Sequence, residues 1–176
     1  MSTNEASQDL RKHIEATVDS FLSAYEDRRK ANDPSVINRV VTPDCTRQLL
    51  PASLCKALGA PEEFHMPNDL YEKLFSDDLS LGGMDNLVNK HLSIDVEDRR
   101  AAVTSQGDMI YHHGEVVPLE FSWTFYLNED DTKISKVIEF ADAIGVMKMA
   151  AIAKERGATA RQAQDVDFNG TGYVGA

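Results

Sequence analysis

The second half of the chain contains four long segments rich in β-branched and aromatic residues, and they constrain the fold more than any other feature. They span residues 87–97, 100–112, 116–128 and 133–142. The polar connections between them, at Glu97-Asp98, at 113–115 and at 128–131, have the length of hairpin loops. Strands joined in this way run antiparallel, so the pattern predicts a mostly antiparallel sheet.

The first half predicts helices. Residues 8–30 place apolar side chains three and four positions apart, which is typical of an amphipathic helix. Pro34 can open a short second helix over 34–41, after which Thr42-Pro43-Asp44 breaks the chain. A third helix is predicted over 67–80, where Gly82-Gly83 stops it.

The remaining segments are less regular. Residues 45–66 are predicted to be irregular, with a short strand at 46–50, whereas 143–156 are predicted to form a C-terminal helix. Helices segregated to one face of an antiparallel sheet define an α+β fold. We therefore expect a cone-shaped α+β barrel, with three N-terminal helices on a curved sheet, as a single domain over residues 1–156. Residues 157–176 are expected to be a weakly ordered extension.

Composition excludes several classes of function. The net charge is −11 and the pI is about 4.8, so nucleic acids and anionic membranes are not expected partners. The polar N-terminus does not resemble a signal peptide, and no apolar run is long enough for a membrane span. Two cysteines, Cys45 and Cys55, favour reduced thiols in a cytoplasmic protein.

No cofactor motif is present, and no metal site is expected. His112 and His113 are adjacent on a strand, so their side chains point to opposite faces and cannot easily chelate one ion. Chemistry without a cofactor depends on proton transfer by ionisable side chains in a pocket that excludes water.

Glu139 is the clearest candidate for such chemistry, because it stands between Ile138 and Phe140 in an apolar strand. Burial would raise the pKa of its carboxyl group and let it exchange protons with a substrate. Alternatively, Glu139 is an outward-facing strand residue. Asp142 ends the same strand, where it either lies at the rim of the cavity or caps the following helix.

Arg39 and His65 are candidates in the first half of the chain. Arg39 occurs in the apolar stretch VINRVV, where it either reaches solvent or points into the cavity to bind an oxyanion or orient Glu139. His65 precedes the third helix and could act as an acid or base, or it could be an ordinary surface histidine.

The strands supply further candidates. Tyr111 and His113 share one face of their strand, where Tyr111 could donate a hydrogen bond or serve as a core residue. Phe121, Trp123 and Phe125 form an aromatic stripe that is either plain core or the wall of a ligand cavity.

Three groups of short motifs resemble the SnoaL-like group of the nuclear transport factor 2-like superfamily. These motifs are Thr42-Pro43-Asp44-Cys45 with Pro51-Ala52-Ser53-Leu54, the stretch Met66 to Tyr71, and the two final strands, 120–125 and 133–142. Together they resemble small fungal isomerases and cyclases, including meroterpenoid isomerases and an indole-alkaloid semipinacolase. The resemblance covers residues 8–156 and implies the cone-shaped fold and its cavity.

The sequence therefore predicts a cofactor-independent isomerase or cyclase that acts on an oxidised natural product. Arg39, Glu139, Tyr111 and His65 are its expected catalytic residues, with Arg39 and Glu139 close together in one cavity. Trp123, Phe121, Phe125, His113 and Asp142 are expected to bind substrate. The alternatives are a binding or dimerisation module of the same fold, or a dehydratase or epoxide hydrolase.

A homodimer is expected through the convex face of the sheet, because apolar residues occupy both faces of the last two strands. Phe121 and Trp123 are assigned to one face, and Val137 with Tyr126 to the other.

Overall fold

A computed structural model describes residues 3–130 and 132–156. The chain begins with a long helix, α1 (Thr3–Ala31), and continues through a 3₁₀ turn, η1 (Pro34–Asn38), and strand β1 (Val41–Leu50). The middle of the chain forms α2 (Ala52–Ala57), β2 (His65–Pro67) and α3 (Asn68–Leu81). Strands β3 (Gly82–Asp95), β4 (Arg100–Tyr111), β5 (Val116–Leu127) and β6 (Ile134–Ala141) follow, and α4 (Ala143–Glu155) ends the described chain.

The strands form one curved sheet in the order β2-β1-β6-β5-β4-β3. All neighbouring pairs are antiparallel except β1 and β6, which run parallel. The prediction of an α+β fold with a mostly antiparallel sheet is therefore confirmed. The parallel pair arises because β1 belongs to the N-terminal half and joins the sheet beside the last strand.

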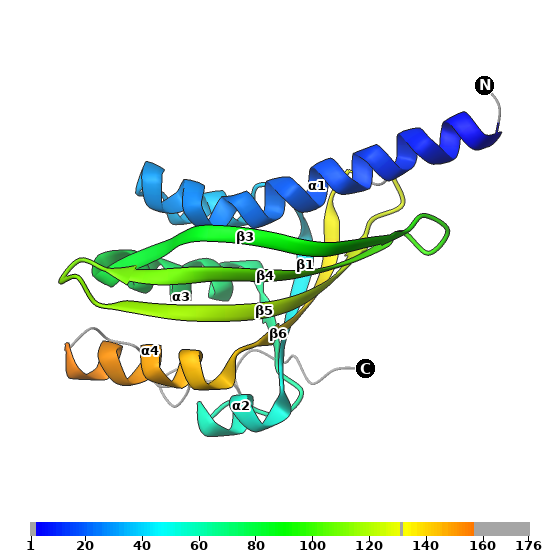
Figure 1. The fold of residues 1–176 in the computed structure, drawn as a ribbon. Helices are drawn as coiled ribbons and strands as arrows, with labels where there is room; N and C mark the ends of the chain where they lie inside the picture. The colour runs from blue at the N-terminus through cyan, green and yellow to red at the C-terminus, as the bar shows by residue number, and fades with distance from the viewer. Residues whose placement is uncertain (1–2, 131, 157–176) are drawn as a thin grey trace.

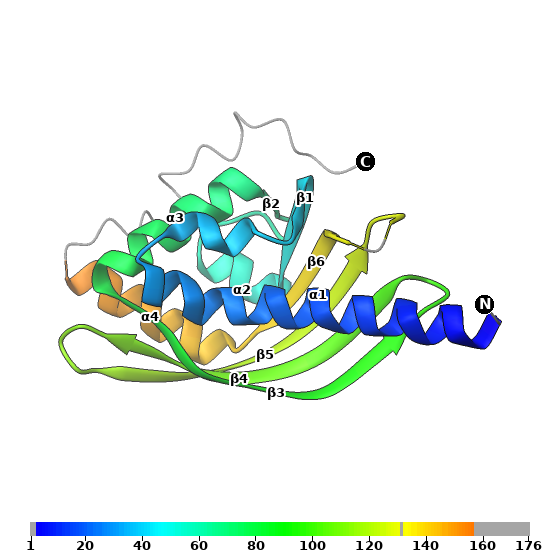
Figure 2. The ribbon, with the colours of Figure 1, turned by 90° about the horizontal axis from the view of Figure 1, so that it is seen from above.

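The helices cover the concave face of this sheet. In Figure 2 the strands β3, β4 and β5 curve around α1 and α3, and Figure 1 shows α1 beside β3 and α4 beside β5. The inner face of α1 is fully buried at Ile14, Val18, Phe21 and Leu22. On the sheet, Val103, Trp123, Phe125 and Val137 belong to the same core. Burial of apolar surface between helices and sheet is the main stabilising contribution to this arrangement.

Local sequence accounts for the helix boundaries. Asn32 follows α1 with a φ of 51°, a left-handed conformation that asparagine tolerates at the end of a helix. Asp33 then caps η1, where its side chain accepts a hydrogen bond from the backbone N–H of Ser35. The expected helix over 34–41 is thus a short 3₁₀ turn that ends at Asn38.

Two other expectations for the first half were wrong. Thr42-Pro43-Asp44 does not break the chain but lies inside β1, where the register with β6 shifts between Val41 and Thr46. Within the segment 45–66 the predicted strand at 46–50 is confirmed as part of β1, but the segment also contains α2 and the start of β2, so it is not otherwise irregular as expected. Proline is tolerated where the strand departs from regular pairing, and this explains the mistaken prediction.

The glycine pair ends α3, as predicted, but it also opens β3. A side chain at Gly82 would place its Cβ 2.1 Å from the backbone oxygen of Ile110 on β4. Glycine is therefore required for the close approach of these two strands. The expected C-terminal extension, residues 157–176, lies outside the described residues.

Candidate active site

Glu139 faces the concave side of the sheet. Strand β6 alternates, so Glu139 points inward with 8% of its surface exposed, whereas Phe140 points outward with 51% exposed. The register places Glu139 opposite Trp123 on β5 and opposite Leu49 on β1. The inward-facing alternative is therefore the one that the fold adopts.

A chain of hydrogen bonds leads from Glu139 to α1. The hydroxyl of Tyr71, on α3, donates to Glu139 Oε2 over 3.1 Å. The hydroxyls of Tyr25 and Tyr71 lie 2.6 Å apart. Because Tyr71 uses its proton on the carboxylate, Tyr25 donates to Tyr71. Burial, followed by the charge of Glu139, raises the pKa values of both tyrosines, so both hydroxyls keep their protons at neutral pH.

Arg47 supplies a buried positive charge beside this chain. It lies on β1 with none of its surface exposed, and its guanidinium carbon is 4.2 Å from the centre of the Tyr71 ring. Nη1 donates to Asn68 Oδ1 over 2.7 Å and Nη2 to Asn38 Oδ1 over 2.8 Å. The amide oxygens satisfy hydrogen bonds without neutralising the cation, so its charge acts on the surroundings.

The pKa of Glu139 is raised from 4.5 to about 7. Burial of the carboxyl group is the main cause, because it penalises the charged form. The hydrogen bond from Tyr71 and the charge of Arg47 act in the opposite direction and limit the increase. A carboxyl group that titrates near neutral pH can donate a proton and later accept one, which is what acid–base catalysis requires.

Aromatic side chains lie beside Glu139 on the inner face of the sheet. Trp123 stacks on Phe121, with ring centroids 5.2 Å apart, and on Phe125 at 6.2 Å. Phe21 and Tyr25 from α1 meet the indole ring at 5.9 and 5.6 Å. The predicted aromatic stripe therefore lies inside, next to Glu139. Phe121 is partly exposed, whereas Trp123 and Phe125 belong to the buried core.

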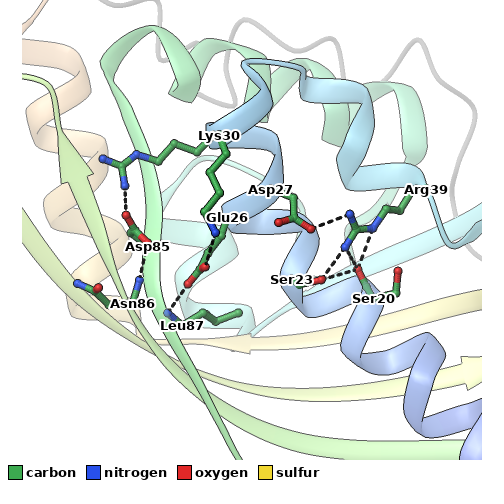
Figure 3. Close-up of polar contacts among 10 residues, drawn as sticks. Ser20, Ser23, Glu26, Asp27, Lys30, Arg39, Asp85, Asn86 and Leu87 are labelled. Atoms are coloured by element: carbon green, nitrogen blue, oxygen red, sulfur yellow. Dashed lines mark hydrogen bonds and ion pairs between the residues drawn. The ribbon is translucent and has the colours of Figure 1, made fainter.

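Arg39 does not share this environment, and its predicted proximity to Glu139 was wrong. The side chain lies along the outside of α1, where Nη1 contacts Asp27 Oδ2 at 2.8 Å and Nη2 contacts Ser23 Oγ at 2.6 Å (Figure 3). Both Nε and Nη2 also donate to the backbone oxygen of Ser20. The physical reason is that η1 ends at Asn38, so the arginine that follows it turns to the solvent-exposed side of α1.

The expected convergence of Tyr111 with Glu139 also fails. Tyr111 is buried, but it ends β4 eight positions beyond Val103, which pairs with Trp123. At about 3.3 Å per residue, this is of the order of 25 Å along the strand. His113 is near Tyr111, with ring centroids 5.4 Å apart, and contacts Glu115 at 3.4 Å in an exposed turn.

The other two predicted residues have local structural contacts. Asp142 caps α4, because its side chain accepts a hydrogen bond from the backbone N–H of Ile144, as one of the two alternatives anticipated. His65 lies half-buried on β2, where it pairs with Gln48 on β1.

Sequence reasoning missed three members of the candidate site: Tyr25, Tyr71 and Arg47.

Some kinds of site are not found in the described part of the chain. No group of three or more His, Cys, Asp or Glu residues among residues 3–130 and 132–156 is arranged to hold a metal ion. Within the same residues, none of the helices combines the length and apolar character needed to cross a membrane. Between α1 and β3 lies an open groove of about 260 Å³, lined by residues that include Leu22, Asn89 and Val103, and Glu139 is not among its lining residues.

Known structures share this fold. BvnE pinacolase from Penicillium brevicompactum has a TM-score of 0.68 and 20% sequence identity, over 88% of this chain and 97% of that chain. PrhC from Penicillium brasilianum NBRC 6234 has a TM-score of 0.69 and 14% identity, also over 88% and 97%. An NTF2-like protein of unknown function from Burkholderia pseudomallei K96243 has a TM-score of 0.53 and 14% identity, over 77% and 95%.

These similarities show that the chain shares its fold with these proteins, one of which is named NTF2-like, so the fold implied by the sequence motifs is confirmed. No protein-family model matches the sequence, and no curated protein matches it at a significant level. A shared fold does not determine a reaction, so function must be argued from the site.

Proposed function

We propose that the protein is a cofactor-independent isomerase or cyclase that rearranges a small oxidised natural product by acid–base catalysis. The observation that supports this proposal is the buried carboxyl group of Glu139, with its pKa near 7. Such a group is half protonated at neutral pH, so both the acid and the base forms are available to the substrate.

The reaction can be written with all atoms conserved. Protonated Glu139 donates its proton to an epoxide oxygen, and one C–O bond of the ring breaks while the oxygen stays on the neighbouring carbon as a hydroxyl group. In an α-hydroxy ketone, the proton goes instead to the carbonyl oxygen, and the carbonyl carbon becomes electron-poor. A neighbouring group or double bond then shifts to the electron-poor carbon. The carboxylate of Glu139 finally removes a proton from the rearranged cation, which restores the acid and gives a neutral product. No oxidant or reductant is consumed.

The neighbours of Glu139 support such a sequence. Tyr71 stabilises the carboxylate by a hydrogen bond, and the charge of Arg47 keeps the pKa from rising further. The aromatic rings of Trp123 and Phe121 can stabilise positive charge on the substrate and hold it in one conformation. The similar fold of BvnE, which is named a pinacolase, also favours a rearrangement over other chemistry.

A screen for products of unchanged mass tests the proposal. Chelator-dialysed protein would be incubated with polycyclic epoxides and α-hydroxy ketones, without nucleotide, and the products analysed by liquid chromatography and mass spectrometry. We expect a product with the mass of the substrate. Gain of one water would indicate an epoxide hydrolase, and loss of one water a dehydratase. Binding without conversion would indicate a binding module, and each of these three outcomes contradicts the proposal.

We also propose a homodimer formed through the convex face of the sheet. Val88 and Phe140 are each 51% exposed and Val116 is 45% exposed on the strands, which supports an additional covering surface. Val137, which the sequence analysis assigned to the outer face, pairs with Phe125 on the inner face and does not contribute to this surface. Light scattering at micromolar concentration should give twice the chain mass of 19.5 kDa, and a monomer would contradict the proposal.

A further inference from the structure

Trp123 carries a buried donor with no hydrogen-bond partner. The residue is 2% exposed, and its indole Nε1 makes no hydrogen bond to any described residue. A donor left unsatisfied in the interior loses its hydrogen bonds to water without replacement. Most buried polar groups in proteins are paired, so an exception of this kind indicates a missing partner.

The unpaired donor stands beside the candidate acid. Trp123 and Glu139 are directly opposite on β5 and β6, and residues in such positions have Cβ atoms about 5 Å apart. The Tyr25 ring, which belongs to the same hydrogen-bonded chain as Glu139, lies 5.6 Å from the indole ring. A substrate that reaches the carboxyl group of Glu139 is therefore within reach of the indole N–H.

The other donors in this cluster are already engaged, with the exception of Arg47 Nε. Tyr71 donates to Glu139 and Tyr25 to Tyr71. Both terminal nitrogens of Arg47 donate hydrogen bonds, to Asn68 and to Asn38. Its buried Nε has no hydrogen-bond partner, like the indole nitrogen of Trp123. Arg47 and Trp123 belong to β1 and β5, the strands on either side of β6. The guanidinium group of Arg47 has several N–H donors, whereas the indole N–H is the only donor of Trp123. A hydrogen bond from Trp123 therefore has a single possible donor atom.

We propose that Trp123 donates a hydrogen bond from Nε1 to an oxygen of the substrate, and so selects ring compounds that carry a carbonyl or hydroxyl group. This inference rests on the proposed function, because it assumes that the substrate occupies the space beside Glu139. Phe121, which is partly exposed and stacks on Trp123, places the indole ring next to the partly exposed part of this aromatic cluster. The surrounding aromatic rings favour a flat or compact ring system.

The chain contains a single tryptophan, so one indole ¹⁵N–¹H signal reports on this donor. The probes are 1-indanone, which has a carbonyl oxygen, and indane, which has the same ring skeleton without it. We expect 1-indanone to move the indole proton signal downfield in proportion to occupancy, and indane to leave it in place. The signal should move in the same way in Glu139→Gln, because the hydrogen bond does not depend on proton transfer.

A matched variant provides a second measurement. In Trp123→Phe, we expect 1-indanone to bind about three- to tenfold more weakly, the effect of one neutral hydrogen bond. The affinity for indane should be unchanged if the variant is folded, as the dispersion of its methyl signals would report. The wild-type titration does not depend on this variant, so it remains decisive if the variant fails to fold.

Two results would overturn the inference. One is binding of 1-indanone, seen in other resonances, with an unmoved indole signal. That result would mean that the N–H points at a ring, for which Phe21 is placed, since it meets Trp123 edge-on at 5.9 Å. The other is the absence of any binding of 1-indanone at millimolar concentration. Neither result bears on acid catalysis by Glu139, which the isomerisation screen tests separately.

Discussion

Arg39 and Arg47 are separated by only eight positions in the sequence, yet they lie in opposite environments. Arg39 lies against the outer side of α1 with 32% of its side chain exposed, and contacts Asp27. Arg47 is fully buried in the interior and contacts Asn38 and Asn68. Both arginines have several hydrogen bonds, so the number of polar contacts does not distinguish them.

Burial distinguishes the surroundings of Arg39 from those of Arg47. Around Arg39, solvent screens the charges, and an exposed ion pair of this kind contributes little to stability. Around Arg47, the low dielectric constant lets the charge influence the pKa of Glu139. The comparison teaches that chemistry should be sought where ionisable groups are buried together, and the following variants test it.

The largest effect is expected from Glu139→Gln. The amide keeps the shape of the carboxyl group but cannot transfer a proton, so turnover of an identified substrate should fall by about 10²–10⁴-fold. Glu120→Gln is the matched control, because Glu120 lies exposed on the neighbouring strand β5. Its turnover should equal that of the wild type. Full activity in Glu139→Gln, with circular dichroism unchanged, would contradict the role of Glu139.

Arg47→Met should produce the next largest effect. Loss of the buried cation leaves Asn38 and Asn68 without their donor, and we expect a loss of about 3 kcal/mol in the free energy of unfolding in urea. The pKa of Glu139 should also rise above its wild-type value, because the positive charge that lowers it is gone. Titration of the carboxyl ¹³C signal would measure this change.

Two further variants isolate the effect of the charge. Arg28 is equally buried and lies over the ring of Phe75, 4.4 Å from its centre. Arg28→Met should therefore destabilise the protein comparably while leaving the pKa of Glu139 almost unchanged. Arg47→Lys keeps the cation and should hold this pKa close to the wild-type value. Equal pKa changes in Arg28→Met and Arg47→Met would show that general disruption, not the charge of Arg47, controls Glu139.

An effect of similar size should appear in the pH dependence of stability. The folded protein holds the Glu139 proton up to a pKa of about 7, whereas the unfolded chain releases it near 4.5. Between these values the folded state binds more protons, so Glu139 makes the protein less stable as pH rises. Relative to Glu139→Gln, the wild type should lose about 3 kcal/mol between pH 4.5 and pH 8. A difference that stays constant with pH would mean that the pKa is not raised.

The sequence predicted the elements of the second half well, because strand alternation and hairpin connections are local signals. The same alternation indicated that Glu139 and Trp123 could face the interior, and the register shows that they share the inner face. The first half was predicted less well. The pairing of β1 with β6 joins distant parts of the chain, and no local pattern specifies it.

The missed site residues have the same explanation. Tyr25 and Tyr71 fall on apolar faces of helices, where they are easily taken for plain core residues, although a buried tyrosine hydroxyl requires a partner. Arg47 alternates with Cys45 and Leu49 along β1, and this was the available signal for an inward arginine. Arg47 already lies in the predicted strand at 46–50, and extending that strand by one residue, to Cys45, would have revealed the alternation.

The smallest effect is expected from Arg39→Ala, and this variant tests the other half of the comparison. Its ion pair with Asp27 is partly exposed on both sides, so its loss should cost at most about 1 kcal/mol in the free energy of unfolding. Because Arg39 contacts only the outer side of α1 in its hydrogen bonds to Ser20 and Ser23, turnover and the pKa of Glu139 should stay at their wild-type values. Urea unfolding, the substrate assay and the carboxyl ¹³C titration would measure the three quantities. A tenfold loss of turnover in folded Arg39→Ala would mean that an exposed arginine contributes to the reaction, and the distinction between the two clusters would then fail.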